Sequence, residues 1–567
     1  MGRRENFDDL ELISKEQNWL GRSLVHLRQR RKDNRIGLVL GAGITHEAGC
    51  PLWSSLVNKL AKALPKSAGI KRGAKSAKLE APYLTEVIYR RFLNSDFEKS
   101  SGNPNYIHIA NSRWITQIRK ALYEKVSDSK IRAHPYLDKL AQLARSCQLV
   151  VTFNFDDILD EKMSELAEKN REQVPTVRYC LPESLRQAAT TIYHINGVLP
   201  RIKGRKRSEE LVFTEDAFAK ILMNSDVLKS EYLISQFSER TFLLIGLSLT
   251  DASLRSLLRA SKERNPANHH YMIVHCGPND HPSHEEKRDI FTVNLEVYNV
   301  ITIFLSSTGI ASTLEKINSD DDGKFGLFVT KLGGFSAYKY YVVGAIGTGK
   351  TTLIEHLRCF MTVEEWTGRV PEYMYEDHAK LTSEQRKLID DWLWSQFKNK
   401  DSIFKALNSG IGVMDRGPLD LFAFSLSSDE NLKKIDSIRT RIFPGGETFD
   451  NGQIIFLEAS DETLETRQIR RGRLDGEASS RNYSAKALSE QSKALQLIYA
   501  PNLRFNTSLD SPTQLAQKVA RLILLGEYNY VDFSARINEI SNNSGSISLE
   551  TRSKKRRKRR TVLARER

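Results

Sequence analysis

The sequence predicts an α/β protein of two domains, each built on a parallel sheet. The chain has 567 residues, which is more than one ordinary domain holds. Apolar residues make up 40% and charged residues 27%, as in globular proteins. Short apolar runs alternate with longer amphipathic stretches, which is the pattern of strands joined by crossover helices. This composition excludes collagen-like and wholly disordered chains, and no apolar run approaches the ~20 residues of a membrane span.

Two series of expected strands set the domain boundaries. The first series lies at 36–40, 149–153, 191–195, 242–245, 271–275 and 300–304. The second lies at 340–343, 412–415, 453–458 and 504–506, with helices expected at 352–360 and 512–525. We therefore expect a helical extension at 1–33, a first α/β domain at 34–306, a linker at 307–334, a second α/β domain at 335–533 and a disordered basic tail at 534–567.

Charge and cysteine content indicate the setting and the partners. The formal charge is +15, and residues 551–567 carry ten Lys/Arg and one Glu, so the rest of the chain is only mildly basic. The tail could bind nucleic acid, but it lacks interleaved aromatic residues, and a solvated tail is the alternative. Five cysteines lie far apart without a CxxC pair, which argues against a zinc ribbon or a disulfide framework. With no signal peptide at the N-terminus, we expect a cytoplasmic protein with no membrane partner.

A phosphate-binding loop opens the second domain. Residues 344–351, GAIGTGKT, fit the pattern GxxxxGK[ST] between an apolar strand and an expected helix. Main-chain N–H groups would turn toward a phosphate, Lys350 would neutralise the β- and γ-phosphates, and Thr351 would hold Mg²⁺. The predicted nucleotide-binding residues here are Gly344, Gly347, Gly349, Lys350, Thr351 and Thr352. The alternative is a fortuitous glycine-rich turn.

Further polar residues could complete a phosphoryl-transfer site. Asp415 and Arg416 end an apolar strand, where ligand sites of α/β sheets lie. Arg467, Arg470 and Arg471 share one face of an expected helix. Together with Arg473 they could close over phosphate oxygens as a lid. A solvated basic helix face is the alternative for this cluster.

In these motifs, residues 335–533 resemble the P-loop nucleoside and nucleotide kinases, particularly the deoxynucleoside kinase group. The resemblance implies ATP and Mg²⁺ as ligands and places Arg416 at the family's substrate- and phosphate-contacting arginine. Glu372, which we expect at the end of a further strand, falls at the place of the general base, although an exposed loop glutamate fits the pattern equally well. Whether a nucleotide or a deoxynucleoside is the ligand stays open, and the domain could bind a nucleotide as a sensor with little turnover.

In the first domain, small and polar residues follow several of the expected strands. GAGIT at 41–45 and GCPLW at 49–53 follow the first strand, TFNFD at 152–156 ends the second, and GLSLTD at 246–251 ends the fourth. Such residues at the carboxyl ends of parallel strands are what a dinucleotide crevice needs. The GxG turn by itself is equally consistent with an ordinary strand–helix connection.

In the pattern and order of these motifs, residues 34–306 resemble the sirtuin-like family, whose fold is a Rossmann-like sheet that binds NAD. The chain lacks the Cys pairs of the sirtuin zinc module and is similar to the zinc-free branch, bacterial antiphage effectors that hydrolyse NAD. The resemblance implies that the protein forms a homo-oligomer. It also implies that Asn154 positions water or ribose and that Asp156 orients the site. The residues that it implies for NAD binding are Gly41, Ala42, Gly43, Thr45, Pro51, Trp53, Gly246, Ser248 and Asp251.

One position departs from the family pattern. Asn196 stands before Gly197 where the family has histidine, and an amide cannot take a proton near neutral pH. The domain could be a natural pseudoenzyme that only binds NAD, His194 could replace the missing base, or Asn196 could be an engineered change that disarms the enzyme. We favour the engineered change, because every other family position is filled. A core histidine satisfied by a neighbour is the structural alternative for His194.

Three functional hypotheses follow. The first is an antiphage effector whose sirtuin-like domain cleaves the nicotinamide–ribose bond of NAD under the control of a nucleotide bound to the kinase-like domain. The second is a deoxynucleoside or nucleotide kinase that carries an inactive NAD-binding regulatory domain. The third is a nucleic-acid-binding scaffold that acts through the basic tail.

Overall fold

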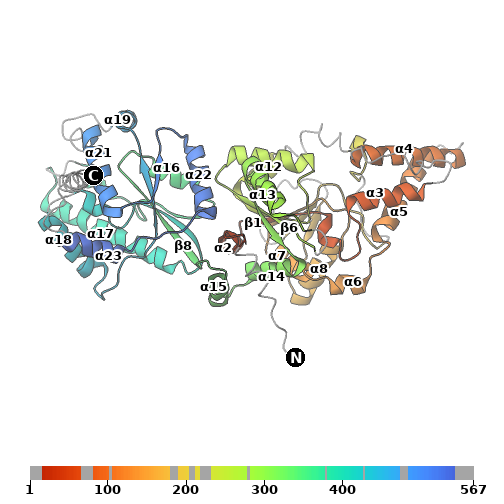
Figure 1. Cartoon of the computed structure of the whole chain (residues 1–567), viewed down its shortest axis with the longest axis horizontal. Coiled ribbons are helices and arrows are strands. Elements are labelled where there is room, and N and C mark those ends of the chain that lie inside the picture. Colours follow the sequence, from red (N-terminus) through yellow and green to blue (C-terminus); the bar gives the residue numbers. More distant parts are fainter. Residues whose placement is uncertain are drawn as a thin grey trace, which may run out of the picture. The chain divides into compact units, whose positions relative to one another are not determined.

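A computed structural model describes residues 16–64, 81–100, 105–178, 190–202, 211–217, 231–277, 281–376, 380–424, 428–472 and 483–542. The chain divides into two compact units, Met1–Phe335 and Ser336–Arg567. Figure 1 shows a sheet flanked by helices in each of them. The α/β class with two parallel sheets is confirmed.

Seven strands form the sheet of the first unit, and every pairing within it is parallel. They are β1 (Ile36–Leu40), β2 (Leu149–Thr152), β3 (Thr176–Arg178), β4 (Thr191–His194), β5 (Thr241–Ile245), β6 (His270–His275) and β7 (Val300–Leu305). Their order is β3-β4-β2-β1-β5-β6-β7, so β2, β4 and β3 lie on one side of β1, whereas β5, β6 and β7 follow one another on the other side. The order therefore reverses between β1 and β5, where open α/β sheets bind ligands at the carboxyl ends of their strands.

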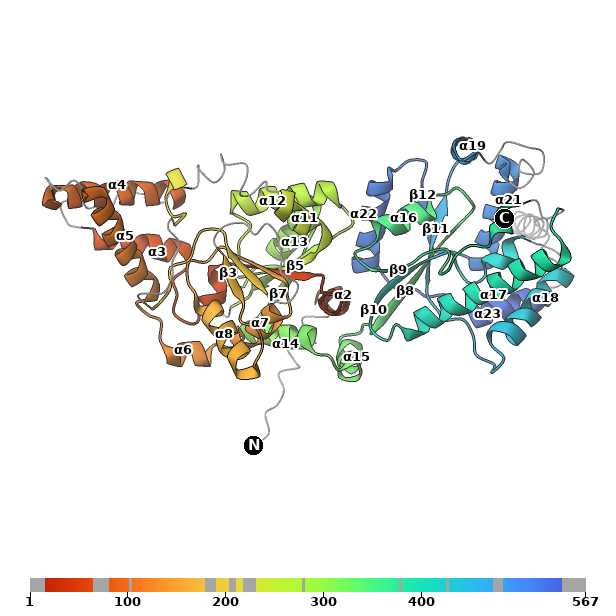
Figure 2. The same ribbon diagram turned by 180° about the vertical axis from the view of Figure 1, so that it is seen from behind.

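Helices cover both faces of this sheet. They are α2 (Leu20–Lys32), α3 (Trp53–Ala63), α4 (Ala81–Ser100), α5 (Tyr106–Tyr123), α6 (Asp128–Ala133), α7 (Leu137–Arg145), α8 (Ile158–Asn170), α11 (Glu231–Glu239), α12 (Ala252–Arg264), α13 (His284–Tyr298), α14 (Ser307–Asn318) and α15 (Asp322–Lys331), with the 3₁₀ turn η1 (Ala42–Thr45). Apolar side chains of α11 and α12 pack on the central strands in one buried cluster. Helices α3, α4 and α5 gather beyond the end of the sheet, as Figure 2 shows, and pack around Trp114 in a second cluster.

The expected linker at 307–334 instead contains the helices α14 and α15 of the first unit. Asp321 caps α15 by accepting a hydrogen bond from the N–H of Lys324. Arg28 of α2 binds Asp322 at 2.6 Å and lies over the ring of Phe325. The acidic run that indicated a linker is thus bound to a basic helix end, a pairing that composition alone does not reveal.

Five parallel strands form the sheet of the second unit, in the order β12-β11-β8-β10-β9. They are β8 (Ala337–Gly344), β9 (Met361–Val363), β10 (Gly410–Asp415), β11 (Gln453–Glu458) and β12 (Leu503–Asn506). The helical elements are α16 (Lys350–His356), η4 (Glu372–Tyr375), α17 (Ser383–Ala406), η5 (Asp420–Phe424), α18 (Ser428–Ser437), η6 (Ile438–Ile442), α19 (Asp461–Arg470), α21 (Ala485–Tyr499), α22 (Pro512–Leu525) and α23 (Phe533–Asn542).

Other elements also differ from the expectations, among them the helix expected at 352–360, which is α16 at Lys350–His356. The strands β3 and β9 were not expected, because each has three residues and little apolar pattern. The predicted disordered tail at 534–567 begins inside α23, whose Phe533 is fully buried against Tyr341 and Tyr499. Residues 543–567, which include the basic run, lie outside the described residues.

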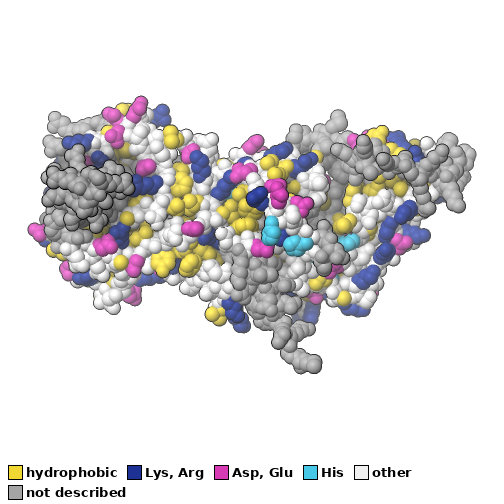
Figure 3. All heavy atoms as spheres, in the orientation of Figure 1, with side chains coloured by type: hydrophobic (Ala, Val, Ile, Leu, Met, Phe, Trp, Pro, Cys, Tyr) yellow, Lys and Arg dark blue, Asp and Glu magenta, His cyan; other side chains and the backbone are white. Residues whose placement is uncertain are grey.

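Charge is mixed on the visible face of each unit (Figure 3). On the face seen in Figure 3, basic and acidic side chains are interspersed among the described residues. Among the helices described, none combines the length and apolar character needed to cross a membrane.

Candidate functional site

In the first unit, the GxG turn after β1 and the turn after β5 pack main chain against main chain. The N–H of Gly43 donates to the carbonyl of Gly246 at 3.0 Å. A Cβ on Gly41 would lie 2.5 Å from that carbonyl oxygen, and a Cβ on Gly246 would lie 2.6 Å from the nitrogen of Ile44. Gly246 also has a φ of +70°, which side chains rarely adopt. The predicted glycines therefore meet at the point where the strand order reverses, and only glycine fits this approach.

Asp156 ties this turn to the end of β2. Its carboxylate accepts a hydrogen bond from the hydroxyl of Thr45 at 2.9 Å, and both side chains are buried. The pKa of Asp156 is raised to about 6, because the effect of burial exceeds the opposing effect of the hydrogen bond from Thr45. The predicted orienting residue thus acts on Thr45, one of the predicted NAD contacts.

Asn154 and Asn196 lie at the carboxyl ends of the neighbouring strands β2 and β4. The side-chain Nδ2 of Asn196 donates to the carbonyl of Phe153 at 3.0 Å. The Oδ1 atom of Asn154 is buried and has no hydrogen-bond partner in the described part of the chain. An unpaired amide oxygen at this edge of the sheet is available to a ligand.

His194 is held inside the fold. Its Nε2 lies 2.9 Å from a carboxylate oxygen of Asp160, and its Nδ1 lies 3.0 Å from the carbonyl of Asn154. Burial by itself lowers the pKa of His194, but the carboxylate of Asp160, the carbonyl of Asn154 and the charge of Asp156 together outweigh burial and raise that pKa. Both ring nitrogens are engaged and the side chain is 1% exposed, so this geometry favours a core histidine over a substitute base. Asp160, which the sequence analysis did not single out, is its partner on the first turn of α8.

The remaining residues predicted to bind NAD surround this edge. The ring of Trp53, next to the half-buried Pro51, stacks on Phe155 with centroids 5.8 Å apart. Ser248 is exposed and shares a hydrogen bond with Thr250. Asp251 caps α12 by accepting from the N–H groups of Ser253 and Leu254, so its visible contacts are those of a helix cap. Ala42 is half-buried in η1.

In the second unit, the phosphate loop is closed on itself. The Nζ of Lys350 donates to the carbonyls of Gly344 and Ala345 at 2.9 and 3.0 Å, and the N–H of Ile346 donates to Oε1 of Gln491. Burial lowers the pKa of Lys350 to about 8, and the positive charge of Arg416 adds to that effect. These are main-chain and ammonium groups that a phosphate would bind in place of their present partners.

Thr351 and Asp415 form a pair of hard oxygen donors beside this loop. The hydroxyl of Thr351 donates to Oδ2 of Asp415 at 2.8 Å. Asp415 is 0% exposed, and its Oδ1 has no hydrogen-bond partner among the described residues. Oxygen ligands of this kind suit Mg²⁺, so the residues present fit the implied metal. Thr352 follows as a half-buried residue of α16.

The structure brings Glu365, and not the expected Glu372, to the arginine at the end of β10. The Nε of Arg416 donates to Oε1 of Glu365 at 2.7 Å. Arg416 has a φ of +66°, an uncommon conformation of the kind that often marks functional sites. Glu372 lies exposed in the 3₁₀ turn η4 and does not end a strand, because β9 ends earlier, at Val363. Glu365 was missed because β9 is too short to predict, although it follows that strand by two residues.

Lys400 joins these two strand ends. Its Nζ donates to the carbonyl of Asp415 at 2.5 Å and to that of Glu365 at 3.3 Å. Burial lowers its pKa to about 8. The lysine thus links the main chain at Glu365 to the main chain at Asp415.

The predicted arginine lid is placed only in part. Arg467 is half-buried, and it donates to the carbonyl of Gly347 and to Thr507 rather than facing an open site. Arg471 is exposed at the end of α19, and Arg473 lies outside the described residues. The glycines Gly347 and Gly349, with φ near +90°, shape the loop below Arg467.

Comparisons with known proteins agree with the first unit. Residues 148–301 match the family model of a SIR2-like domain, and such a domain implies NAD binding. The same segment contains β2 to β6 and therefore Asn154, Asn196 and Gly246. No curated protein matches the chain.

Two solved structures are similar to parts of the chain. One is shikimate kinase from Acinetobacter baumannii in complex with shikimate, at 16% identity, covering 36% of this chain and 97% of that one, with a TM-score of 0.22. The other is a structure of a Sir2 enzyme, at 13% identity, covering 52% of this chain and 96% of that one, with a TM-score of 0.23. Both TM-scores are low, and the fold of each unit is defined by its own strand order.

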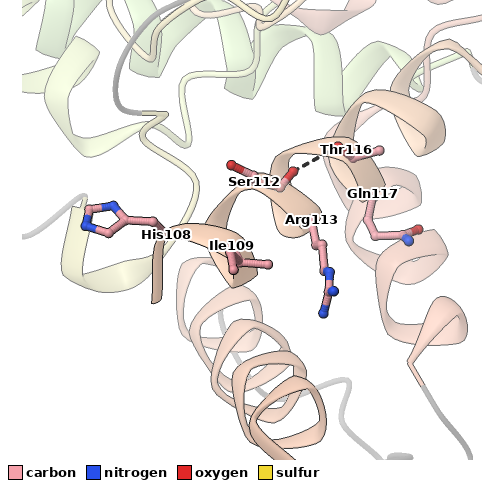
Figure 4. A pocket seen from close by; sticks show the side chains of 6 residues that line it. All are labelled: His108, Ile109, Ser112, Arg113, Thr116 and Gln117. Atoms are coloured by element: carbon pink, nitrogen blue, oxygen red, sulfur yellow. Dashed lines mark hydrogen bonds between the residues drawn. The ribbon is translucent and has the colours of Figure 1, made fainter. Parts of the chain in front are cut away.

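Two other features stand apart from these sites. A pocket of about 430 Å³ lies on the outer side of α5, lined by His108, Ile109, Ser112, Arg113, Thr116 and Gln117. Figure 4 shows its side chains spread along the helix rather than converging on one point. In the described residues, no group of three or more His, Cys, Asp or Glu side chains could hold a metal ion.

Proposed function

We propose that this protein is a bacterial antiphage effector, in which the SIR2-like unit hydrolyses NAD⁺ when position 196 carries the family's histidine and the second unit controls that reaction by binding a nucleotide. The observation that carries the proposal is the match of residues 148–301 to a SIR2-like domain, in a segment that holds Asn154, Asp156 and Asn196 just after the strands β2 and β4. The phosphate loop, with Lys350 beside its carbonyls and the pair of Thr351 and Asp415 next to it, supports nucleotide binding by the second unit.

The roles of the residues follow from their contacts. Bound NAD would supply a nicotinamide–ribose bond that water can cleave. Asn154 presents a free amide oxygen that can orient the water or a ribose hydroxyl. Asp156 holds Thr45 of the GxG turn in place. Asn196 occupies the edge where a proton acceptor is needed, and as an amide it cannot take that proton.

The test is NAD⁺ consumption by the Asn196→His variant, measured with and without added deoxynucleotides. We expect NAD⁺ loss in this variant, none in the chain with Asn196, and none in the double variant that also carries Asn154→Ala. Asn196→His protein that leaves NAD⁺ intact under every nucleotide condition would refute the NADase assignment.

A second candidate is a nucleotide or deoxynucleoside kinase with an NAD-binding regulatory unit. The contact between Glu365 and Arg416 favours it, because a carboxylate beside the phosphate loop can accept the proton of a substrate hydroxyl. Transfer of phosphate from ATP to a panel of deoxynucleosides and their monophosphates, by protein that does not consume NAD⁺, would favour this candidate over the first.

A further inference from the structure

A buried glutamine lies beside the phosphate loop without satisfying its own amide. Gln468 is on the inner face of α19 and is 0% exposed. Neither Nε2 nor Oε1 has a hydrogen-bond partner in the described part of the chain. Because a buried amide without partners destabilises a fold, such a group calls for an explanation.

The amide of Gln468 lies directly on the loop. A Cβ built on Gly347, the second glycine of the loop, would overlap Nε2 of Gln468. Arg467, the neighbouring residue, donates to the carbonyl of the same glycine at 3.0 Å. Gln491 of α21 accepts from the N–H of Ile346, the residue before that glycine. Two glutamines therefore contact adjacent residues of the loop, and only Gln491 has found a partner there.

We propose that Gln468 is a further nucleotide-binding residue, whose amide gains its hydrogen bonds from a nucleoside polyphosphate seated in the loop. The two Nε2–H donors suit phosphate oxygens, and Oε1 can accept from a ribose hydroxyl or from a loop N–H that the ligand frees. A leucine of similar size would fill the same space without the unsatisfied amide, so the fold alone gives no reason for glutamine. This inference rests on the proposed nucleotide binding by the second unit.

The decisive variant is Gln468→Leu in the full chain, with Mg·ATP and ADP as probes. Removal of an unsatisfied amide is expected to raise the unfolding midpoint of the ligand-free protein by roughly 2–4 °C. Loss of hydrogen bonds to charged phosphate is expected to weaken nucleotide binding by about tenfold or more, as measured by calorimetry. A variant that is more stable but binds nucleotide more weakly shows that Gln468 contacts the ligand, because loss of a purely structural contact would lower stability.

Gln453→Leu is the matched control. Gln453 is also a buried glutamine with an unpartnered Oε1, but it lies at the amino end of β11, the end of the strand opposite to the ligand edge. Its replacement is expected to change the midpoint and to leave the affinity for nucleotide unaltered. Gln468→Met serves as a second variant if Gln468→Leu does not fold.

The outcomes separate the inference from the proposed function. Unchanged affinity in Gln468→Leu, while Lys350→Ala loses binding, overturns the role of Gln468 alone. A lower unfolding midpoint in Gln468→Leu, or an equal loss of affinity in Gln453→Leu, also overturns it. If the unsubstituted chain binds neither nucleotide, the proposed nucleotide binding fails and the inference fails with it.

Discussion

The two units each place a glycine-rich turn after their first strand, but the two turns are held in different ways. In the first unit, main chain meets main chain between Gly43 and Gly246. In the second unit, side chains from α19 and α21 contact the loop, and Lys350 folds back on its carbonyls. The first turn is therefore shaped by the fold itself, whereas the second is held by contacts that a ligand can replace. Four predictions test this contrast, from the largest expected effect to the smallest.

The largest effect is expected at the strand end beside the second loop. Under the second candidate function, a kinase, Glu365→Gln should reduce phosphoryl transfer from ATP by roughly 10²- to 10⁴-fold, because a neutral amide cannot accept a hydroxyl proton. Nucleotide binding should persist, since the phosphate loop is intact. Glu372→Gln, at the exposed position, is the control and should retain full transfer. Equal losses in the two variants would contradict the assignment of Glu365.

The next effect tests the main-chain contact of the first unit. Gly246→Ala should destabilise that unit by about 3 kcal/mol or more, because it adds a clash with backbone to a strained φ. Gly333→Ala is matched in φ, at +76°, but has no atom within 4 Å of its Cβ, so it should cost about 1–2 kcal/mol. Thermal unfolding measures both variants. Equal shifts of the two unfolding midpoints would show that the close approach of Gly246 to the main chain of Ile44 does not contribute to stability.

A buried carboxyl group in the first unit should make stability depend on pH. The folded-state pKa of Asp156 is about 6, above its ordinary value of 3.8, so the folded form holds its proton more tightly than the unfolded form. Its contribution is complete below pH 3.8 and is lost as pH rises through 6, by about 3 kcal/mol in total. Asp156→Asn should remove this component, as seen in the difference between the two denaturation profiles. Parallel profiles from pH 4 to 7 would show that the carboxyl is not desolvated.

The smallest effect concerns the lysine of the second loop. Because the pKa of Lys350 is about 8, raising the pH from 8 to 9 should remove most of its remaining charge and weaken ATP binding by about fivefold. The ionisable groups that face it are Arg416, Asp415, Asp420 and Glu365. Lys350→Arg, whose charge does not titrate in this range, should bind with a flat profile. Calorimetry across this pH interval is the measurement, and a flat profile in the unsubstituted chain would refute the titration.

Sequence patterns correctly located the strands, helices and glycine-rich turns that depend on residues close together in the chain. The strand Ile36–Leu40, the strand Gln453–Glu458 and the helix Pro512–Leu525 match their expected bounds, because apolar runs and caps are local signals. The phosphate loop and the GxG turn were found in the same way, since each needs glycine at a fixed spacing after a strand.

Other features depend on partners that are distant in sequence, and no local pattern encodes them. The bond from Arg416 selected Glu365 over Glu372, and Asp160 placed His194 in the core. The acidic run at 320–322 became part of a helical pair because Arg28 of α2 lies beside it. The sequence by itself determined which backbone turns can approach a phosphate, because that depends on glycine alone. Only the tertiary structure decided which charged side chains face those turns, because hydrogen bonds and burial between remote strands set their positions and their protonation.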